Sequence, residues 1–468
     1  MKARDAVVWI IATTVMACGE RRPPQASIAA TPGSAAPSTS DLASQDGGGR
    51  TERVLESRQE SGPIARMLPR VERIRGLDST RDIPGVAIDR PGLISRIRQH
   101  VAIELPAGAI RNEGRELQLL GFLDTGFDYE AAEYQLLEDQ LAGFYEPGDR
   151  TMYLASDLEP QDADATLAHE LVHALQDQRW HLDELSRYRP GESDFAAAIG
   201  SLAEGDATSA MLDFVIESNM PGSKRKAPDM PDELCEAQFR EGFDRGRRSS
   251  IPAIMTRSLI APYLYGTLFV HALRRQGGWD EVNRAWSNLP TTTEQILHVD
   301  KWRVHEPPVH VGAPPFASLG SGWLAIDQDS EGELGTRIAF EQWLGASSAA
   351  ACSAPWGGDR GVLVENGDRT AFAWRVRYDP GKSPYEHSQR VFPVLAEGLS
   401  QHLGPPAVHK RSLVCFERHE LGPLALGVEG PDLLLVAGPA RTSARGPWSS
   451  DATCSLAQTW IKEIASAQ

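Results

Sequence analysis

Residues 165–178 read ATLAHELVHALQDQ, and no other segment of the chain constrains the structure as much. Apolar residues recur in it at three- and four-residue spacing, which is typical of a helix with one buried face. Residues four apart on a helix are rotated by roughly 400° and separated by about 6 Å along the axis, so His169 and His173 lie on one face. Both imidazoles can therefore bind the same metal ion.

Glu170 follows the first of these histidines and lies roughly 100° around the helix from it. At that position a carboxylate stands beside a bound ion and can accept a proton from an attacking water molecule. His-Glu-x-x-His thus supplies two ligands and a general base, which is a pattern of zinc-dependent hydrolysis. The sequence predicts one Zn²⁺ ion bound by His169 and His173, with Glu170 as the catalytic base.

A catalytic zinc ion needs a third protein ligand and an open position for water. Glu204 is the candidate, because it lies in a later predicted helix, residues 194–218, whose small residues favour close packing. Glu192 and Glu217 are rivals, but one lies in a loop and the other near a helix end. Asp206 is the nearer rival. Residues two apart on a helix are rotated by roughly 200° relative to each other, so Asp206 and Glu204 cannot both face one ion.

HELVH followed by a Glu on a later helix resembles the gluzincin branch of the zincin metallopeptidases, which includes the thermolysin-like enzymes. The resemblance implies that His169, His173 and Glu204 are zinc ligands and that Glu170 is the base. It also implies that RTMYLAS, residues 150–156, is the edge strand along which an extended peptide substrate lies.

One position departs from this family. Thermolysin-like enzymes have an Asp four residues after the ligand Glu, where it supports a ligand His, whereas this chain has Thr208. Support must then come from Thr208, from a backbone carbonyl or from elsewhere. A peptidase also needs a hydrogen-bond donor for the tetrahedral oxyanion. Tyr263, Tyr265 and His298 lie in segments that could return to the cleft, and the sequence does not choose among them.

A closer resemblance covers about residues 70–400. Uncharacterised bacterial lipoproteins and secreted proteins carry similar GFYEP, AHELVHALQDQ, EGDA, PYLYG, TTTEQILH and WGGDR segments. That group is assigned peptidase character mainly by its zinc motif. The resemblance is therefore consistent with the zinc hypothesis and is not independent evidence for it.

The amino terminus has the pattern of an export signal. Lys2 and Arg4 precede the apolar stretch AVVWIIATTVMA, which is too short to span a bilayer as a stable helix. The stretch ends in VMAC, which resembles the bacterial lipoprotein box. By that resemblance Cys18 is lipidated and becomes the mature amino terminus, and the alternative is a plain secretory signal with an incidental cysteine. We therefore expect a protein of the bacterial cell envelope, held on a membrane by lipid and facing the periplasm or the exterior.

The chain divides into four parts by composition and periodicity. Residues 1–18 are the expected signal peptide, and residues 19–60, rich in Ala, Ser, Pro and Gly, are an expected disordered tether. Residues 61–310 are predicted to form a mainly helical, zincin-like domain with a small edge-stranded sheet. Residues 311–468 are predicted to form a smaller α+β domain, with a hairpin at the NGD of GVLVENGDRTAFAWRVRY. The fold class is α+β.

Four cysteines follow the lipoprotein box: Cys235, Cys352, Cys415 and Cys454. An even number outside the cytoplasm permits two disulfides, with three possible connectivities. Cys415 with Cys454 is the preferred pair, because both lie in the carboxyl-terminal region.

The whole pattern favours a membrane-tethered zinc metallopeptidase that acts on peptide or protein substrates. The net charge of −17 excludes a nucleic-acid partner, because phosphate binding needs a basic face. Two alternatives use the same residues. One is an envelope lipoprotein with a binding or assembly role, whose metal site is structural or whose peptidase fold is inactive. The other is a zinc-dependent hydrolase of a non-peptide amide such as a cell-wall bond.

Overall fold

A computed structural model describes residues 53–55, 62–140, 143–157, 160–246, 251–383, 385–442 and 447–467. The expected signal peptide and Cys18 lie outside these residues, and so does the expected tether over residues 19–60, apart from residues 53–55. Those three residues, which fall within the range expected for the tether, form a strand paired with residues 85–87. The pairing covers backbone groups that would otherwise form an open sheet edge.

The amino-terminal part contains a four-stranded sheet of order β1-β2-β4-β3. Strands β2 and β4 are parallel, and the other two pairs are antiparallel. Strands β3 and β4 form the hairpin of this sheet. The strands are β1 (Arg53–Leu55), β2 (Gly85–Ile88), β3 (Gly143–Glu146) and β4 (Thr151–Ala155).

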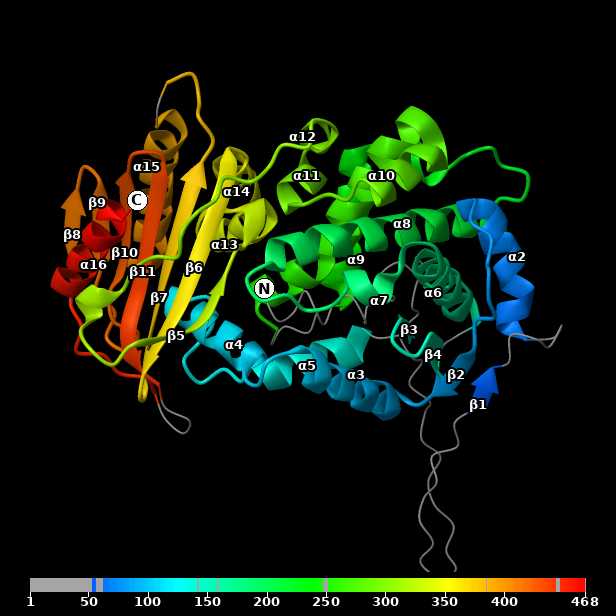
Figure 1. Ribbon diagram of the computed structural model, residues 1–468, viewed down its shortest axis with the longest axis horizontal. Coiled ribbons are helices and arrows are strands. Elements are labelled where there is room, and N and C mark those ends of the chain that lie inside the picture. The colour runs from blue at the N-terminus through cyan, green and yellow to red at the C-terminus, as the bar shows by residue number, and fades with distance from the viewer. Residues whose placement is uncertain are drawn as a thin grey trace, which may run out of the picture.

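Helices form the larger share of this part of the molecule (Figure 1). They are α2 (Pro63–Arg75), α3 (Arg90–Glu104), α4 (Ala109–Leu120), α5 (Tyr129–Gln140), α6 (Pro160–Trp180), α7 (Leu182–Leu185), α8 (Ser193–Asn219), α9 (Asp232–Gly246), α10 (Ala253–Ser287), α11 (Thr293–Leu297) and α12 (Val299–Arg303). Helix α8 is the central one, because every residue from Ala197 to Met211 is buried. It packs on α6 on one side and on α10 on another.

Two glycines let α8 and α10 approach closely. A Cβ atom on Gly205 of α8 would lie 2.8 Å from the Cα of Gly266 of α10, and closer still to its carbonyl group. A Cβ atom on Gly266 would in turn collide with the backbone carbonyl of Ser201. Side chains at either position would therefore force the helices apart, since carbon atoms in contact lie about 3.5–4.0 Å apart.

Helix α10 is bent at Gly277 and Gly278, whose backbone angles are not helical. It is also long and apolar enough to cross a membrane, by length and composition alone. Within its apolar window, however, 83% of the residues are buried inside the protein. The core helix of a globular protein has the same properties, so α10 is weak evidence for a membrane span.

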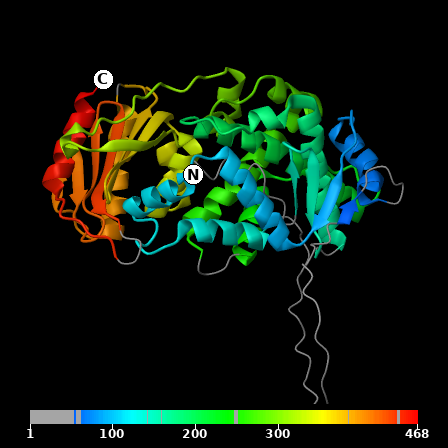
Figure 2. The ribbon, with the colours of Figure 1, turned by 60° about the horizontal axis from the view of Figure 1, so that its bottom comes forward.

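The carboxyl-terminal part is built on a seven-stranded antiparallel sheet of order β5-β6-β7-β11-β10-β9-β8. This sheet lies at one end of the molecule, in yellow to red in Figures 1 and 2. The strands are β5 (Leu324–Asp329), β6 (Trp356–Asn366), β7 (Arg369–Tyr378), β8 (Val408–Lys410), β9 (Leu413–Phe416), β10 (Leu424–Glu429) and β11 (Asp432–Arg441). The hairpin expected at NGD joins β6 to β7.

Both faces of this sheet are covered by helices. Alternate side chains of a strand point to opposite faces, so Val362 and Val364 pack toward α16 while Leu363 packs toward α13, α14 and α15. The covering helices are α13 (Gly332–Leu344), α14 (Ala346–Ser353), α15 (Glu386–Leu403) and α16 (Cys454–Ser466). Helix α4, from the amino-terminal part, also packs on this sheet through Leu119 and Leu120. The α+β class predicted from the sequence is confirmed.

A disulfide between Cys415 of β9 and Cys454 ties the sheet to α16. The preferred pairing is therefore confirmed. Cys235 and Cys352 are free and buried, one in each part of the molecule. The second disulfide that the cysteine count permits is not formed.

Candidate metal centre

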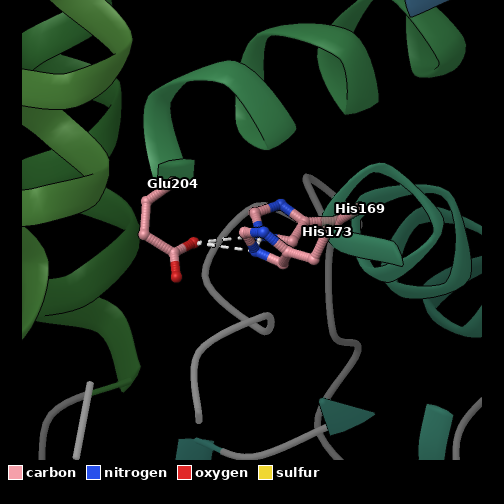
Figure 3. A group of neighbouring side chains, drawn as sticks. All are labelled: His169, His173 and Glu204. Atoms are coloured by element: carbon pink, nitrogen blue, oxygen red, sulfur yellow. Dashed lines mark hydrogen bonds and ion pairs between the residues drawn. The ribbon is translucent and has the colours of Figure 1, made fainter. Parts of the chain in front are cut away.

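The two histidines and the predicted third ligand come together between α6 and α8 (Figure 3). The Nε2 atoms of His169 and His173 are 2.9 Å apart. The Oε2 atom of Glu204 lies 3.0 Å from the first and 3.4 Å from the second. These three donor atoms form a group that could hold one metal ion.

The close packing of α8 on its neighbours positions Glu204. Gly205, the next residue, brings α8 against α10, and the small side chains around it let α6 approach from another side. The side chains of His169 and Glu204 are only 1% and 3% exposed, and that of His173 is 12% exposed. The ligand group is therefore almost wholly withdrawn from solvent, with His173 nearest to it.

Charge is concentrated in this buried group. Burial is the largest single effect on His173 and lowers its pKa, but Glu204, Glu170 and Gln176 together outweigh burial and raise that pKa to about 9. Burial alone would raise the pKa of Glu204, and the two imidazoles outweigh it and hold that pKa below its ordinary value. In the absence of an ion, His173 and the carboxylate of Glu204 therefore stabilise each other as an ion pair.

Glu170 lies beside this group and is not one of its members. It is 2% exposed, and its Oε2 accepts a hydrogen bond of 2.6 Å from the backbone N–H of Tyr145. Tyr145 belongs to β3, so the carboxylate is fixed between the helix that carries the ligands and the small sheet. This is the placement expected from its 100° rotation on α6.

The expectation about the edge strand is wrong. Residues 151–155 form β4, which lies inside the sheet with β2 on one side and β3 on the other. The strand at the edge is β3, and its Tyr145 N–H points away from β4 toward Glu170. The sequence shows a strand before the HELVH helix, but the order of strands in a sheet depends on pairing between distant segments.

The rivals of Glu204 are all placed elsewhere. Glu192 is exposed at the start of α8, and Glu217 forms ion pairs with Arg70 and Arg73 at the surface. Asp206 accepts two hydrogen bonds from a buried arginine of α2 and one from the indole of Trp286. The opposite orientation of Glu204 and Asp206, expected from helix geometry, is therefore observed.

Support for the ligand histidines does not come from Thr208. Its hydroxyl is buried and has no hydrogen-bond partner among the described residues. Instead, His173 Nδ1 lies 2.9 Å from Oε1 of Gln176, and Nε2 of Gln176 donates to the backbone carbonyl of Ala203. The sequence pattern predicted no role for Gln176, although its position three residues after His173 places the two side chains together on a helix.

Tyr263 is the one candidate oxyanion donor that lies beside the ligand group. Its ring centroid is 6.3 Å from that of His169. Burial, followed by the charges of Glu204 and Glu170, raises the pKa of its hydroxyl well above the ordinary value. The hydroxyl therefore stays protonated.

The other two candidates face different surroundings. The hydroxyl of Tyr265 lies 3.4 Å from Arg240 of α9, and its ring lies under Arg337 of α13. His298 pairs with Glu333 of α13. On the same helix, Tyr263 and Tyr265 are about 200° apart, which is why only one of them can face the ligand group.

A second group of carboxylates, Glu294, Glu306 and Asp379, is spaced closely enough to bind a metal ion. The ammonium group of Lys301 lies within 2.6–2.9 Å of an oxygen of each of them. A cation is therefore already present, and this cluster is an ion-pair network.

Comparison of the chain with protein-family models, with curated proteins and with solved structures finds no match.

Proposed function

We propose that this chain is a zinc-dependent metallopeptidase of the bacterial cell envelope, tethered to a membrane through Cys18. The observation that carries the proposal is the convergence of His169, His173 and Glu204 on one point, with Glu170 beside them. Two imidazoles and one carboxylate are a ligand set of catalytic zinc.

The spacing of the donor atoms supports zinc. Tetrahedral coordination with bonds of about 2.0–2.1 Å places ligand atoms about 3.3 Å apart. The three observed separations, 2.9, 3.0 and 3.4 Å, are within a few tenths of an ångström of that value. Small side-chain movements would therefore accommodate an ion, and the described residues provide three ligands, which leaves a position for water.

His169, His173 and Glu204 would hold the zinc ion, which when bound would supply a Lewis acid that acidifies water and polarises the carbonyl of the scissile amide. Glu170 accepts the proton of the attacking water at its carboxylate and passes it to the leaving amine. The N–H of Tyr145 holds that carboxylate in position through the 2.6 Å hydrogen bond. The hydroxyl of Tyr263, kept neutral by burial, donates a hydrogen bond to the oxyanion.

The decisive experiment compares the wild-type chain with Glu170→Gln. The substitution retains all three ligands, so both proteins are expected to bind one zinc ion per chain. Only the wild type is expected to cleave a denatured casein substrate, because the amide of Gln cannot accept the proton. Equal cleavage by both proteins would rule out this mechanism.

A second candidate function is a structural metal site in an envelope protein with a binding or assembly role. The observation in its favour is the low exposure of Glu170 and Glu204, 2% and 3%. A purified protein that binds zinc tightly and leaves casein intact in both forms would support this second candidate.

A further inference from the structure

Gln176 is fully buried on α6, and the mechanism above does not use it. Both ends of its amide have partners. Its Oε1 lies 2.9 Å from Nδ1 of His173, and its Nε2 donates a hydrogen bond of 3.1 Å to the backbone carbonyl of Ala203. Ala203 directly precedes Glu204, so this one side chain touches the surroundings of two predicted ligands.

The partner on α8 fixes the orientation of the amide. A backbone carbonyl can only accept a hydrogen bond, so the NH₂ group of Gln176 must face Ala203 and the carbonyl oxygen must face His173. An oxygen in that position requires a hydrogen on Nδ1 of His173. The lone pair of a neutral imidazole then lies on Nε2, which is the nitrogen directed toward His169 and Glu204.

We propose that Gln176 is a positioning residue for the metal ion. It holds His173 with Nε2 available as a ligand, and it ties that ligand to the α8 backbone beside Glu204. This inference rests on the proposed zinc centre and goes beyond it, because it assigns the selection of the ligand nitrogen to a neutral amide on the same helix as the histidine.

The surroundings of the site agree with this role. Thr208, at the position where the thermolysin-like enzymes have a supporting Asp, makes no hydrogen bond through its buried hydroxyl within the described part of the chain. Nδ1 of His169 likewise has no partner among the described residues. Among the described residues, the Nδ1 atom of His173 therefore has a hydrogen-bond partner, Gln176, whereas the Nδ1 atom of His169 has none.

The test replaces Gln176 with Leu, which removes both hydrogen bonds and has a similar size. Zinc affinity is measured by competition with a chromophoric chelator. Removing the outer partner of a ligand His typically weakens metal binding 10–100-fold, and we expect a loss of that size. Gln176→Glu retains an acceptor for His173 but cannot donate to Ala203, so its affinity is expected to lie between those of Gln176→Leu and the wild type.

Gln178→Leu is the matched control. Gln178 lies on the same helix and also ties it to another segment, through hydrogen bonds with Thr80 and Arg81, but it does not contact the ligands. Its replacement should lower stability toward urea and leave zinc affinity unchanged. The visible absorption of the Co²⁺-loaded protein, which reports on ligand geometry, should change in Gln176→Leu and not in Gln178→Leu.

The possible outcomes separate the two proposals. A wild-type chain that does not bind zinc overturns the proposed function and this inference with it. A wild type that binds zinc, with equal affinity in Gln176→Leu, overturns the positioning role alone. Equal weakening by Gln176→Leu and Gln178→Leu also overturns it, because the effect would then reflect the stability of α6. Should Gln176→Leu not fold, Gln176→Met, which also removes both hydrogen bonds, takes its place, and wild-type affinity with an unchanged Co²⁺ spectrum in that variant would refute the inference.

Discussion

Substitution of Gly205 by Ala should damage both stability and metal binding. Gly to Ala inside a helix ordinarily stabilises it by about 1 kcal/mol, because Ala has the higher helix propensity. At this position the new Cβ atom would lie 2.8 Å from the Cα of Gly266 and closer still to its carbonyl group. Both of these are backbone atoms, so no side-chain rotation relieves the clash.

The size of the effect follows from these distances. Ordinary contact begins at 3.4 Å, so relieving the contact with the Cα of Gly266 alone requires α8 and α10 to separate by about 0.6 Å, and the closer carbonyl group requires more. Overpacking of this kind costs about 1–3 kcal/mol, which reverses the sign expected from helix propensity. The same shift moves the backbone that carries Glu204, the residue before Gly205, relative to α6, so zinc binding should weaken as well.

Two measurements check this prediction. Urea unfolding gives the change in stability, and chelator competition gives the change in zinc affinity. Gly126→Ala is the control, because a Cβ atom there would meet nothing within 4 Å, and it should leave both quantities nearly unchanged. A Gly205→Ala protein as stable as the wild type, with the same zinc affinity, would refute the reasoning about the approach of the two helices.

Three further outcomes are expected. Tyr263→Phe should lower kcat on a peptide substrate about 100-fold or more, because one oxyanion donor is lost, while zinc content stays the same; an unchanged kcat would exclude that role. Burial raises the pKa of Asp194 from 3.8 to about 8, so the folded chain keeps a proton there that the unfolded chain loses. The contribution of Asp194 to the free energy of unfolding is therefore fully present below about pH 4. It decreases as the pH rises toward 8, by at most about 1.4 kcal/mol per pH unit. Asp194→Asn, which keeps an acceptor for Thr293, should flatten the urea stability curve between pH 5 and pH 8.5, and an unaltered slope would contradict this assignment. Finally, Cys454→Ser opens a loop that the disulfide with Cys415 closes over 39 residues. This should cost about 4 kcal/mol of stability in the chain-entropy model, and wild-type stability in non-reducing urea would show that the bond contributes little.

The sequence alone predicted the features that depend on local geometry. His169 and His173 share a face because they are four residues apart on one helix, and Glu170 is rotated off that face for the same reason. The same geometry separated Glu204 from Asp206. The NGD hairpin of the second sheet likewise follows from a short turn between two alternating segments.

Tertiary structure decided every feature that joins distant segments. The sequence named Tyr263, Tyr265 and His298 equally, and only the packing of α10 on α8 shows which of them lies beside the ligand group. It placed the edge of the small sheet at β4, whereas pairing makes β3 the edge.

The hydrogen bond between Gln176 and His173 also depends on tertiary structure. The spacing of His173 and Gln176 is local and could have been recognised. Their role could not, because the orientation of the amide depends on the carbonyl of Ala203, which a different helix supplies. Helical periodicity fixes directions around one axis, but which face of α8 meets α6 depends on how all the apolar side chains of the domain pack together.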